Sequence, residues 1–558
     1  MAEACPAFAF ISEGSGNKMK VHAAIAQALR DNGVEQLFGL IGDANLYMVD
    51  SFVRDCGGRF ISSANEAGAT LMALGYSNVS AGLGVASVTH GAAVTNTLTA
   101  LVHGVKARVP MLLLCGDTAV EDRENFQNTG QRDHILATGA GFEQLRSPAT
   151  IAQDVATCIR RAFAERRPIV LNIPVEFQWL DTDYAAKPWK PVDNRFTVPE
   201  SDDLDNAIGI IAAARRPVVL AGRGAISPEA RAAVLRFAER IEAPVATTLQ
   251  AKDLFRGEDF DLGICGTLSQ PAVIDTLAAA DCIIAFGASL SPYTLSHGAF
   301  AKGKRFVQVD SDPAQFGRYI TPDVGVLGDA ARTADLFVQW LDAAEIEGAK
   351  ARDEALAATL AAASPWEGMV EPSPDEPVDM PRAIWLLERA FPRDRTVVTD
   401  GGRFLTEPWK NLRVPDPRQF LITLAFGSIG LGMGHAIGAA LAKPDVPVLH
   451  VTGDGGFVLG GLAEFNTAVR HKLDVVTVIC NDGAYGAEHI QFRNKNMDPE
   501  LSVFEWPDFA KVADALGGQG FSVSTFGDLE RAIAAIATRD RPILIDMKFD
   551  PDAMPPLP

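Results

Sequence analysis

Paired cysteines, long apolar runs and an excess of basic residues are all missing from this sequence. The seven cysteines are scattered over 558 residues without a C-x-x-C pair, which is typical of free thiols in a reducing compartment rather than of a disulfide framework. No run of about 18 apolar residues occurs, so we expect no membrane span. The net charge of −20 argues against a generic binder of nucleic acid or of anionic membranes, because such proteins present a basic face.

The first 20 residues also lack the pattern of a secretory signal. The N-terminal stretch "MAEACPAFAFISEGSGNKMK" has no cationic start followed by a long apolar core, so we expect no signal peptide. Together with the unpaired cysteines, this predicts a cytoplasmic location.

Strand–helix alternation is what the sequence has in abundance. Hydrophobic residues make up 47% and charged residues 22%, an ordinary globular composition, and the length predicts about three domains. Continuous apolar runs such as "VPMLLLCG" and "VPVLHVTGDGG" indicate buried parallel strands. We therefore predict three consecutive α/β domains with mainly parallel sheets, at residues 18–185, 203–343 and 381–548. A Pro-punctuated linker at 187–201 and a helical, then Pro- and acid-rich connector at 344–380 join them.

Polar side chains follow three of the predicted strands in the last segment. They are Asp400, Asp454 and Asn481. One strand–helix–strand unit separates Asp454 from Asn481, so both should lie at the carboxyl ends of neighbouring strands, where open α/β sheets bind ligands. A carboxylate, an amide oxygen and a nearby backbone carbonyl form an all-oxygen set that suits Mg²⁺ carrying a phosphate-bearing ligand. Glycines around Asp454 allow backbone N–H groups to approach phosphates at a helix N-terminus.

The motif "GDGGF…ICNDG" resembles the diphosphate-and-metal motif of thiamine-diphosphate (ThDP) enzymes, in the branch of acetolactate synthase, pyruvate decarboxylase and benzoylformate decarboxylase. The resemblance implies ThDP and Mg²⁺ as cofactors, with Asp454, Asn481 and the main-chain carbonyl of Gly483 as metal ligands. Cys480 stands where the family usually has a second Asn. The match covers nearly the whole chain in family order, which implies a pyrimidine-binding, a central Rossmann-like and a diphosphate-binding domain.

Further cofactor contacts follow from the same resemblance. "FISSANEAGATLMAL" is similar to the family's strand-to-Glu junction, which makes Glu66 the carboxylate that pairs with the aminopyrimidine and activates the cofactor. "FGSIGLGMG" is similar to the decarboxylase version "GSIG", in which Ile429 supports the bent cofactor and backbone groups of Gly427 and Ile429 bond the pyrimidine. The diphosphate side is expected to contact the following residues: Gly453, Gly455, Gly456, Asp400 and Gly401.

Candidate substrate-side residues resemble different branches of the family. His90 in "THGAAVTN" is similar to the proton-shuttling histidine of benzoylformate decarboxylase, and Asp43 in "LIGDANL" is similar to an acid of pyruvate decarboxylase. Gln127 in "ENFQ" is similar to a glutamine of acetolactate synthases, and Glu488 occupies a helix on which decarboxylases carry a substrate-side carboxylate. Three further histidines are candidates for the substrate pocket, but a surface or structural role fits each of them at least as well: His134, His297 and His489.

The mixture of motifs leaves the reaction open. We expect a decarboxylase or carboligase that acts on a 2-oxo acid, with or without an aldehyde partner. The alternatives are an acetolactate-synthase-type enzyme using pyruvate, a lyase of an acyloin or a 2-hydroxyacyl thioester, and a catalytically silent regulatory paralogue. FAD would belong to the synthase alternative, but no FAD contacts can be traced in "GICGTLSQPAVIDTLAAAD", so we do not expect it. The family resemblance also implies a homodimer or homotetramer, with the cofactor between domains of two chains.

Overall fold

The computed structural model describes residues 17–192, 196 and 201–554. The N-terminal stretch analysed above falls almost entirely outside the described residues, as do Cys5 and part of the expected linker. The chain divides into two compact units, Met1–Pro191 and Val192–Pro558, and each is described by itself. No helix among the described residues is long and apolar enough to cross a membrane.

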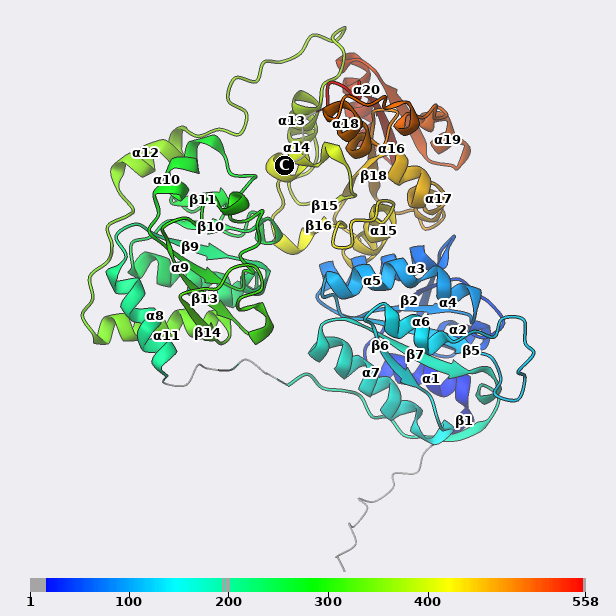
Figure 1. Cartoon of the computed structure of the whole chain (residues 1–558). Helices are drawn as coiled ribbons and strands as arrows, with labels where there is room; N and C mark the ends of the chain where they lie inside the picture. Colours follow the sequence, from blue (N-terminus) through cyan, green and yellow to red (C-terminus); the bar gives the residue numbers. More distant parts are fainter. Residues whose placement is uncertain (1–16, 193–195, 197–200, 555–558) are drawn as a thin grey trace, which may run out of the picture. The chain divides into compact units, whose positions relative to one another are not determined.

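The first unit is built on a six-stranded parallel sheet in the order β3-β2-β4-β5-β7-β6 (Figure 1). A short antiparallel pair, β1 and β8, stands apart from this sheet. The strands are β1 Asn17–Lys20, β2 Gln36–Gly39, β3 Arg59–Ser62, β4 Gly84–Val88, β5 Met111–Asp117, β6 Gly141–Gln144, β7 Pro168–Pro174 and β8 Asp181–Tyr184. The helices are α1 Val21–Asp31, α2 Leu46–Arg54, α3 Glu66–Ser80, α4 Ala92–Asn96, α5 Leu98–Lys106, α6 Gln131–Ala137 and α7 Ile151–Glu165.

Helices cover both faces of this sheet, as the continuous apolar strands require. Side chains of α1, α2 and α7 form one core with alternate residues of the strands, including Leu112 and Leu114. The intervening residues, such as Leu113, are also buried, and α3 and α5 pack on β4 and β7. The strand ends are thereby fixed between two packed layers.

The second unit contains two further six-stranded parallel sheets (Figure 1). The first of them has the order β11-β10-β9-β12-β13-β14. Its strands are β9 Pro217–Ala221, β10 Val245–Thr247, β11 Asp261–Ile264, β12 Cys282–Phe286, β13 Arg305–Asp310 and β14 Val324–Leu327. Its helices are α8 Asp202–Ala213, α9 Pro228–Arg240, α10 Ile274–Ala279, α11 Ala330–Ala343 and α12 Glu354–Ala362. One face packs against α8, α9 and α11, and the other against α10 and α12.

The third sheet has the order β16-β15-β17-β18-β20-β19. Its strands are β15 Thr396–Thr399, β16 Phe420–Ile422, β17 Val448–Gly453, β18 Val475–Asn481, β19 Gln519–Val523 and β20 Ile543–Lys548. Its helices are α13 Met380–Ala390, α14 Thr406–Asn411, α15 Gly432–Ala442, α16 Asp454–Gly456, α17 Leu462–Arg470, α18 Gly486–Asn494, α19 Phe509–Ala515 and α20 Phe526–Ile536. The three α/β domains predicted from the sequence are confirmed as three parallel-sheet domains.

Buried charges link the second and third domains within their common unit. The Asp253 side chain is 1% exposed and accepts hydrogen bonds from Arg413 Nη1 at 2.8 Å and Val414 N at 3.0 Å. Neighbouring Lys252 is fully buried and donates to the carbonyl of Lys410 at 3.2 Å. Because these groups lie on different domains, their pairing requires the two sheets to keep one arrangement.

Candidate active site

Three expected cofactor residues lie at neighbouring strand ends of the third sheet. Strand β15 is paired with β17 and β17 with β18, all in parallel. Asp400 follows β15, Asp454 follows β17, and Asn481 is the last residue of β18. The sheet therefore brings the two expected metal-ligating side chains and Asp400 to one edge, as the strand–helix–strand pattern predicts.

The two expected metal-ligating side chains, Asp454 and Asn481, both lie close to the backbone N–H of Gly483. We call these three residues the metal corner. This N–H donates to Asn481 Oδ1 at 3.2 Å and also reaches the carboxylate of Asp454. Gly483 has a φ of 63°, a backbone conformation that side chains other than glycine rarely adopt. The turn can therefore carry its backbone groups between the two side chains.

Neighbouring side chains fix the orientation of both expected ligands. Asn481 Nδ2 donates to the buried Asp546 at 2.8 Å, so the amide oxygen is the atom that faces the Gly483 turn. Asp454 Oδ1 accepts the N–H of Gly455 at 2.8 Å, and its Oδ2 accepts the indole N–H of Trp506 at 2.9 Å. Trp506 stacks on Phe504 with ring centroids 4.9 Å apart. The ligand geometry is thus set before any cation binds.

The electrostatics of this corner suit a cation. Burial, aided by the negative charge of Asp482, raises the pKa of Asp454 to about 7. Burial also raises the pKa of Asp482 to about 6. Two buried carboxyl groups that resist ionisation are a favourable place for a divalent ion. No cluster of three or more His, Cys, Asp or Glu side chains able to hold a metal occurs in the described part of the chain. The oxygens expected as ligands, those of the Asp454 carboxylate, the Asn481 amide and the Gly483 carbonyl, are of the kind that Mg²⁺ prefers.

The backbone between β17 and α17 forms a glycine cradle. The chain enters α16 at Asp454 and passes through a π-type turn, Phe457–Gly461, before α17. A Cβ on Gly455 would lie 2.4 Å from the Tyr485 ring, and one on Gly460 would lie 2.0 Å from the carbonyl oxygen of Gly430. Side chains at these positions would close the space over the helix start, where a phosphate group is favoured.

Asp400 organises the glycine-rich loop opposite this cradle. Its Oδ2 accepts the N–H groups of Gly430 at 2.9 Å and Gly432 at 3.3 Å, and its Oδ1 accepts the N–H of Gly401 at 2.7 Å. Burial raises the pKa of this carboxyl group, and the backbone N–H groups act in the opposite direction. Asp400 is 2% exposed, so it contacts protein groups rather than solvent.

Ile429 and Gly427 lie on this loop. A Cβ on Gly401 would approach Ile429 Cγ2 to 3.1 Å, so the Ile429 side chain packs over the end of β15. Gly427 has a φ of 76° and open space around its Cα. Ile429 is partly exposed and Gly427 is exposed, which leaves both accessible to a ligand.

Helix α18 after the metal corner carries the expected substrate-side Glu488. Glu488 is exposed in the first turn of this helix. The next residue, His489, is 2% exposed and its Nε2 lies 2.9 Å from Asp552 Oδ1 near the end of the described chain. His489 therefore anchors the C-terminal segment to α18.

In the first unit, Glu66 opens α3 directly after β3. Asn65 caps this helix, because its side chain accepts the N–H of Ala67 at 2.7 Å. Glu66 Oε2 accepts a hydrogen bond from Asn96 Nδ2 at 3.0 Å. Asn96 was not predicted from the sequence, and it fixes one oxygen of the carboxylate.

Asp43 and His90 meet at adjacent strand ends of the first sheet. His90 follows β4 and is 3% exposed, and Asp43 lies in the turn after β2. His90 Nδ1 lies 3.0 Å from the hydroxyl of Thr89, which donates to Asp43 Oδ1 at 2.8 Å. Gln127 is close to this turn through its backbone, since a Cβ on Gly91 would lie 2.4 Å from the Gln127 carbonyl oxygen.

A buried amide network supports the His90–Gly91 turn. Gln131 Oε1 accepts the N–H of Gly91 at 2.6 Å, and its Nε2 donates to Gly116 O at 2.9 Å and to Asn172 Oδ1 at 2.7 Å. Asn172 in turn donates to Asp117 at 2.6 Å. Gly91 has a φ of 60°, so this network stabilises a backbone conformation that the turn needs.

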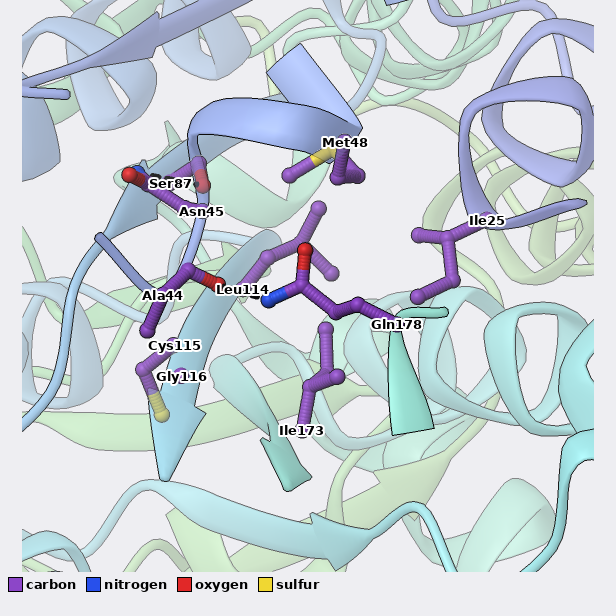
Figure 2. A pocket seen from close by; sticks show the side chains of 10 residues that line it. All are labelled: Ile25, Ala44, Asn45, Met48, Ser87, Leu114, Cys115, Gly116, Ile173 and Gln178. Carbon is purple, nitrogen blue, oxygen red and sulfur yellow. Dashed lines mark hydrogen bonds between the residues drawn. The ribbon is translucent and has the colours of Figure 1, made fainter. Parts of the chain in front are cut away.

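A small cavity is lined by Ala44 and Asn45, which follow Asp43 in its turn, and by Gln178 (Figure 2). Its volume is about 10 Å³, which is enough for one water molecule and too small for a substrate. The Gln178 amide points toward Ala44 and donates to its carbonyl oxygen (Figure 2), whereas Gln178 Oε1 has no hydrogen-bond partner among the residues that the structure describes. The cavity is therefore part of the packing that supports the turn.

The remaining histidines occupy different positions. His134 in α6 contacts the Thr129 hydroxyl through Nε2 at 2.9 Å. His297 belongs to the second domain, has a φ of 52°, and packs its ring edge-on to Tyr293. Sequence reasoning missed five residues of these sites: Asn96, Thr89, Gln131, Asp546 and Trp506. Of these, Thr89 and Asn96 lie within the motif "THGAAVTN".

Comparison with known families gives a consistent result for all three domains. Models of the N-terminal TPP-binding domain, the central domain and the C-terminal TPP-binding domain of thiamine pyrophosphate enzymes match residues 19–137, 204–337 and 400–547. Together these matches span most of the chain.

Individual relatives are similar over nearly their full length. A sulfoacetaldehyde acetyltransferase of Castellaniella defragrans is 28% identical over 545 residues, covering 92% of this chain and 90% of that protein. A probable acetolactate synthase large subunit of Methanocaldococcus jannaschii is 27% identical over 566 residues, covering 97% and 94%. An acetolactate synthase large subunit of Parasynechococcus marenigrum is 28% identical over 544 residues, covering 94% and 86%. The chain belongs to the family of thiamine-diphosphate-dependent enzymes.

Proposed function

We propose that this enzyme uses ThDP and Mg²⁺ to cleave or form a carbon–carbon bond next to the carbonyl group of a small 2-oxo acid or aldehyde. The observation that carries the proposal is the convergence of Asp454 and Asn481 on the Gly483 turn, at the edge of the third sheet. Family membership supports the cofactor, and the oxygen-only donor set supports Mg²⁺.

In this proposal Asp454, Asn481 and the carbonyl of Gly483 hold the metal ion. The glycine cradle, with Gly453, Gly455 and Gly456, receives the diphosphate. Gly401, which lies against Ile429 of the opposing loop, is proposed to contact the diphosphate side, and Asp400 holds that loop. Gly427 and Ile429 of that loop contact the pyrimidine end of the cofactor.

Glu66 is the proposed activating group, because a carboxylate that pairs with the aminopyrimidine favours removal of a proton from the cofactor. Bound ThDP supplies the electron sink for the bond that breaks or forms. His90 and Asp43 then hold or move protons at the substrate, and Gln127 and Glu488 orient it. These four substrate-side roles rest on the family resemblance and on the contact between His90, Thr89 and Asp43.

Glu66 and Asp454 lie in different domains, and we propose that a homodimer or homotetramer completes each cofactor site with domains of two chains. A cytoplasmic location goes with this proposal, since none of the six cysteines that the structure describes forms a disulfide. An active monomer in sedimentation at assay concentration would contradict the shared site.

A second candidate is acyl transfer or lysis involving an aldehyde such as sulfoacetaldehyde, since relatives named for sulfoacetaldehyde acetyltransferase match nearly the whole chain. A silent regulatory paralogue would not need both Glu66 and the metal corner, and it is therefore the weaker alternative.

The cofactor part of the proposal is tested by titration calorimetry with ThDP, with and without Mg²⁺. We expect Asp454→Ala to abolish Mg²⁺-dependent binding, because the cation and diphosphate lose their neutralising carboxylate. Asp445→Ala removes an exposed carboxylate of the same domain and should bind as the unmodified protein does. Unchanged ThDP affinity in Asp454→Ala would refute the metal assignment.

The reaction is tested with a panel of 2-oxo acids and sulfoacetaldehyde, each with and without aldehyde acceptors, with products identified by mass spectrometry. A new carbon–carbon bond or a released aldehyde supports the proposal. Absence of any product, together with absent exchange of the cofactor C2 proton, would indicate the silent paralogue.

A further inference from the structure

The hydroxyl group of Thr89 sits between two proposed proton-transfer residues of the first domain. It donates to Asp43 Oδ1 at 2.8 Å and lies 3.0 Å from His90 Nδ1. The N–H of Ala44 also points at this hydroxyl oxygen, at 3.2 Å. Asp43 Oδ1 itself is 3.5 Å from His90 Nδ1, so Thr89 is the nearer partner of the imidazole.

A hydroxyl group has one proton to donate and lone pairs that accept. The Asp43 side chain is 70% exposed, and an ionised carboxylate only accepts hydrogen bonds. The Thr89 proton is therefore committed to Asp43. The hydroxyl oxygen must then accept from both Ala44 N–H and His90 Nδ1, which requires a proton on Nδ1.

We propose that Thr89, oriented by Asp43, is a positioning residue that holds His90 in the Nδ1–H tautomer and leaves the lone pair on Nε2. Among the described residues, no hydrogen bond reaches Nε2. His90 is thereby prepared to accept a proton through Nε2. The inference rests on the proposed role of His90 in proton transfer, but the tautomer itself exists without a cofactor or substrate.

The surrounding backbone is built to keep the three groups together. A Cβ on Gly42 would lie 2.6 Å from Thr89 Cβ, so a glycine at this position lets the Asp43 turn approach the strand end. Asn45 Oδ1 accepts the N–H of Gly42 at 2.8 Å, and its Nδ2 donates to Ser87 Oγ at 3.1 Å. On the other side, Gln131 holds the backbone of Gly91. Asp117 also interacts with His90: burial raises the pKa of Asp117, and the histidine acts in the opposite direction.

The tautomer is measured by magic-angle-spinning NMR of the full-length protein labelled with ¹⁵N-histidine, because protonated and unprotonated ring nitrogens resonate far apart. The sequence has nine histidines, and the His90 signals are those missing from His90→Gln. We expect His90 to be protonated at Nδ1 and not at Nε2 at neutral pH. A proton on Nε2 in the unmodified protein would overturn the inference.

Two variants test how the tautomer is set. In Thr89→Val the acceptor at 3.0 Å is lost, and in Asp43→Ala the hydroxyl is released to donate to Nδ1. Both should shift the His90 proton toward Nε2. Thr89→Ser keeps the hydroxyl and should restore the Nδ1–H signal. Thr95→Val removes an exposed hydroxyl that donates to Ala92 O within its own helix and should change nothing. An unshifted spectrum in either Thr89→Val or Asp43→Ala would overturn the inference.

Turnover separates this inference from the proposed function. If His90 transfers a proton through Nε2, kcat of Thr89→Val should fall, within the range of about 10²–10⁴-fold that a positioned acid–base group contributes, and Thr89→Ser should recover it. A shifted tautomer with unchanged kcat would support the positioning role of Thr89 and refute the catalytic role of His90.

Discussion

Asp400→Asn tests how far one buried carboxylate organises the glycine-rich loop that carries Gly427 and Ile429. Each carboxylate oxygen of Asp400 faces a backbone N–H: Gly401 on one side, and Gly430 with Gly432 on the other. An Asn side chain offers one oxygen and one NH₂ group. Whichever way the amide is turned, at least one buried N–H meets another donor.

The less costly orientation places the NH₂ group toward Gly401. One backbone N–H then loses its acceptor, at about 1–3 kcal/mol, and the bonds to Gly430 and Gly432 change from charged to neutral, at about 1 kcal/mol each. Removing a buried charge offsets part of this, because burial already raises the pKa of Asp400. We expect a net loss of about 2 kcal/mol in ordering the loop, which corresponds to about 30-fold weaker ThDP binding.

Titration calorimetry with Mg²⁺ and ThDP measures this effect, and circular dichroism shows whether the variant is folded. Asp416→Asn is the matched control, because Asp416 caps a partly exposed turn of the same domain and the amide oxygen can still accept the Arg418 N–H. A folded Asp400→Asn protein that binds ThDP as tightly as the control would refute the role given to Asp400.

Two further predictions concern side chains of the second unit. Burial lowers the pKa of Lys252 to about 7, so above pH 7 this side chain binds more protons in the unfolded chain than in the folded chain. The thermal midpoint of unfolding should therefore rise from pH 7 to 9. Lys252→Met should lose that rise, and an identical pH slope in both proteins would contradict the assignment. Because Trp506 donates to Asp454, its fluorescence should change when Mg²⁺ and ThDP bind. This change should vanish in Trp506→Phe but persist in Trp179→Phe. A fluorescence change that survives in Trp506→Phe would argue against the contact.

The sequence predicts the strand-end positions well, because they depend on local patterns. Asp454 and Asn481 each follow a continuous apolar run, and parallel strands connected through a helix end at the same edge of a sheet. Glu66 was likewise found at a strand-to-helix junction, where Asn65 caps the helix. For these residues, the position at a strand end can be predicted from the sequence of the segment in which each residue lies.

The partners of these residues could not be predicted in the same way. Trp506 and Asp546 reach Asp454 and Asn481 from segments far along the chain, and no pattern within "FEWPDF" or "LIDMK" indicates such a contact. Asn96 reaches Glu66 because α4 folds back beside the start of α3. Such contacts depend on tertiary packing, and only the folded chain defines them.

The exchange rate of the C2 proton of bound ThDP tests the central claim most directly, because it reports activation of the cofactor without any substrate. Glu66→Gln keeps the shape of the side chain and an oxygen that can accept from Asn96, but it removes the charge. We predict that this variant still binds ThDP and Mg²⁺, and that its exchange rate falls by a factor on the order of 10²–10⁴. A normal exchange rate in Glu66→Gln would contradict the account, because Glu66 would then only begin a helix.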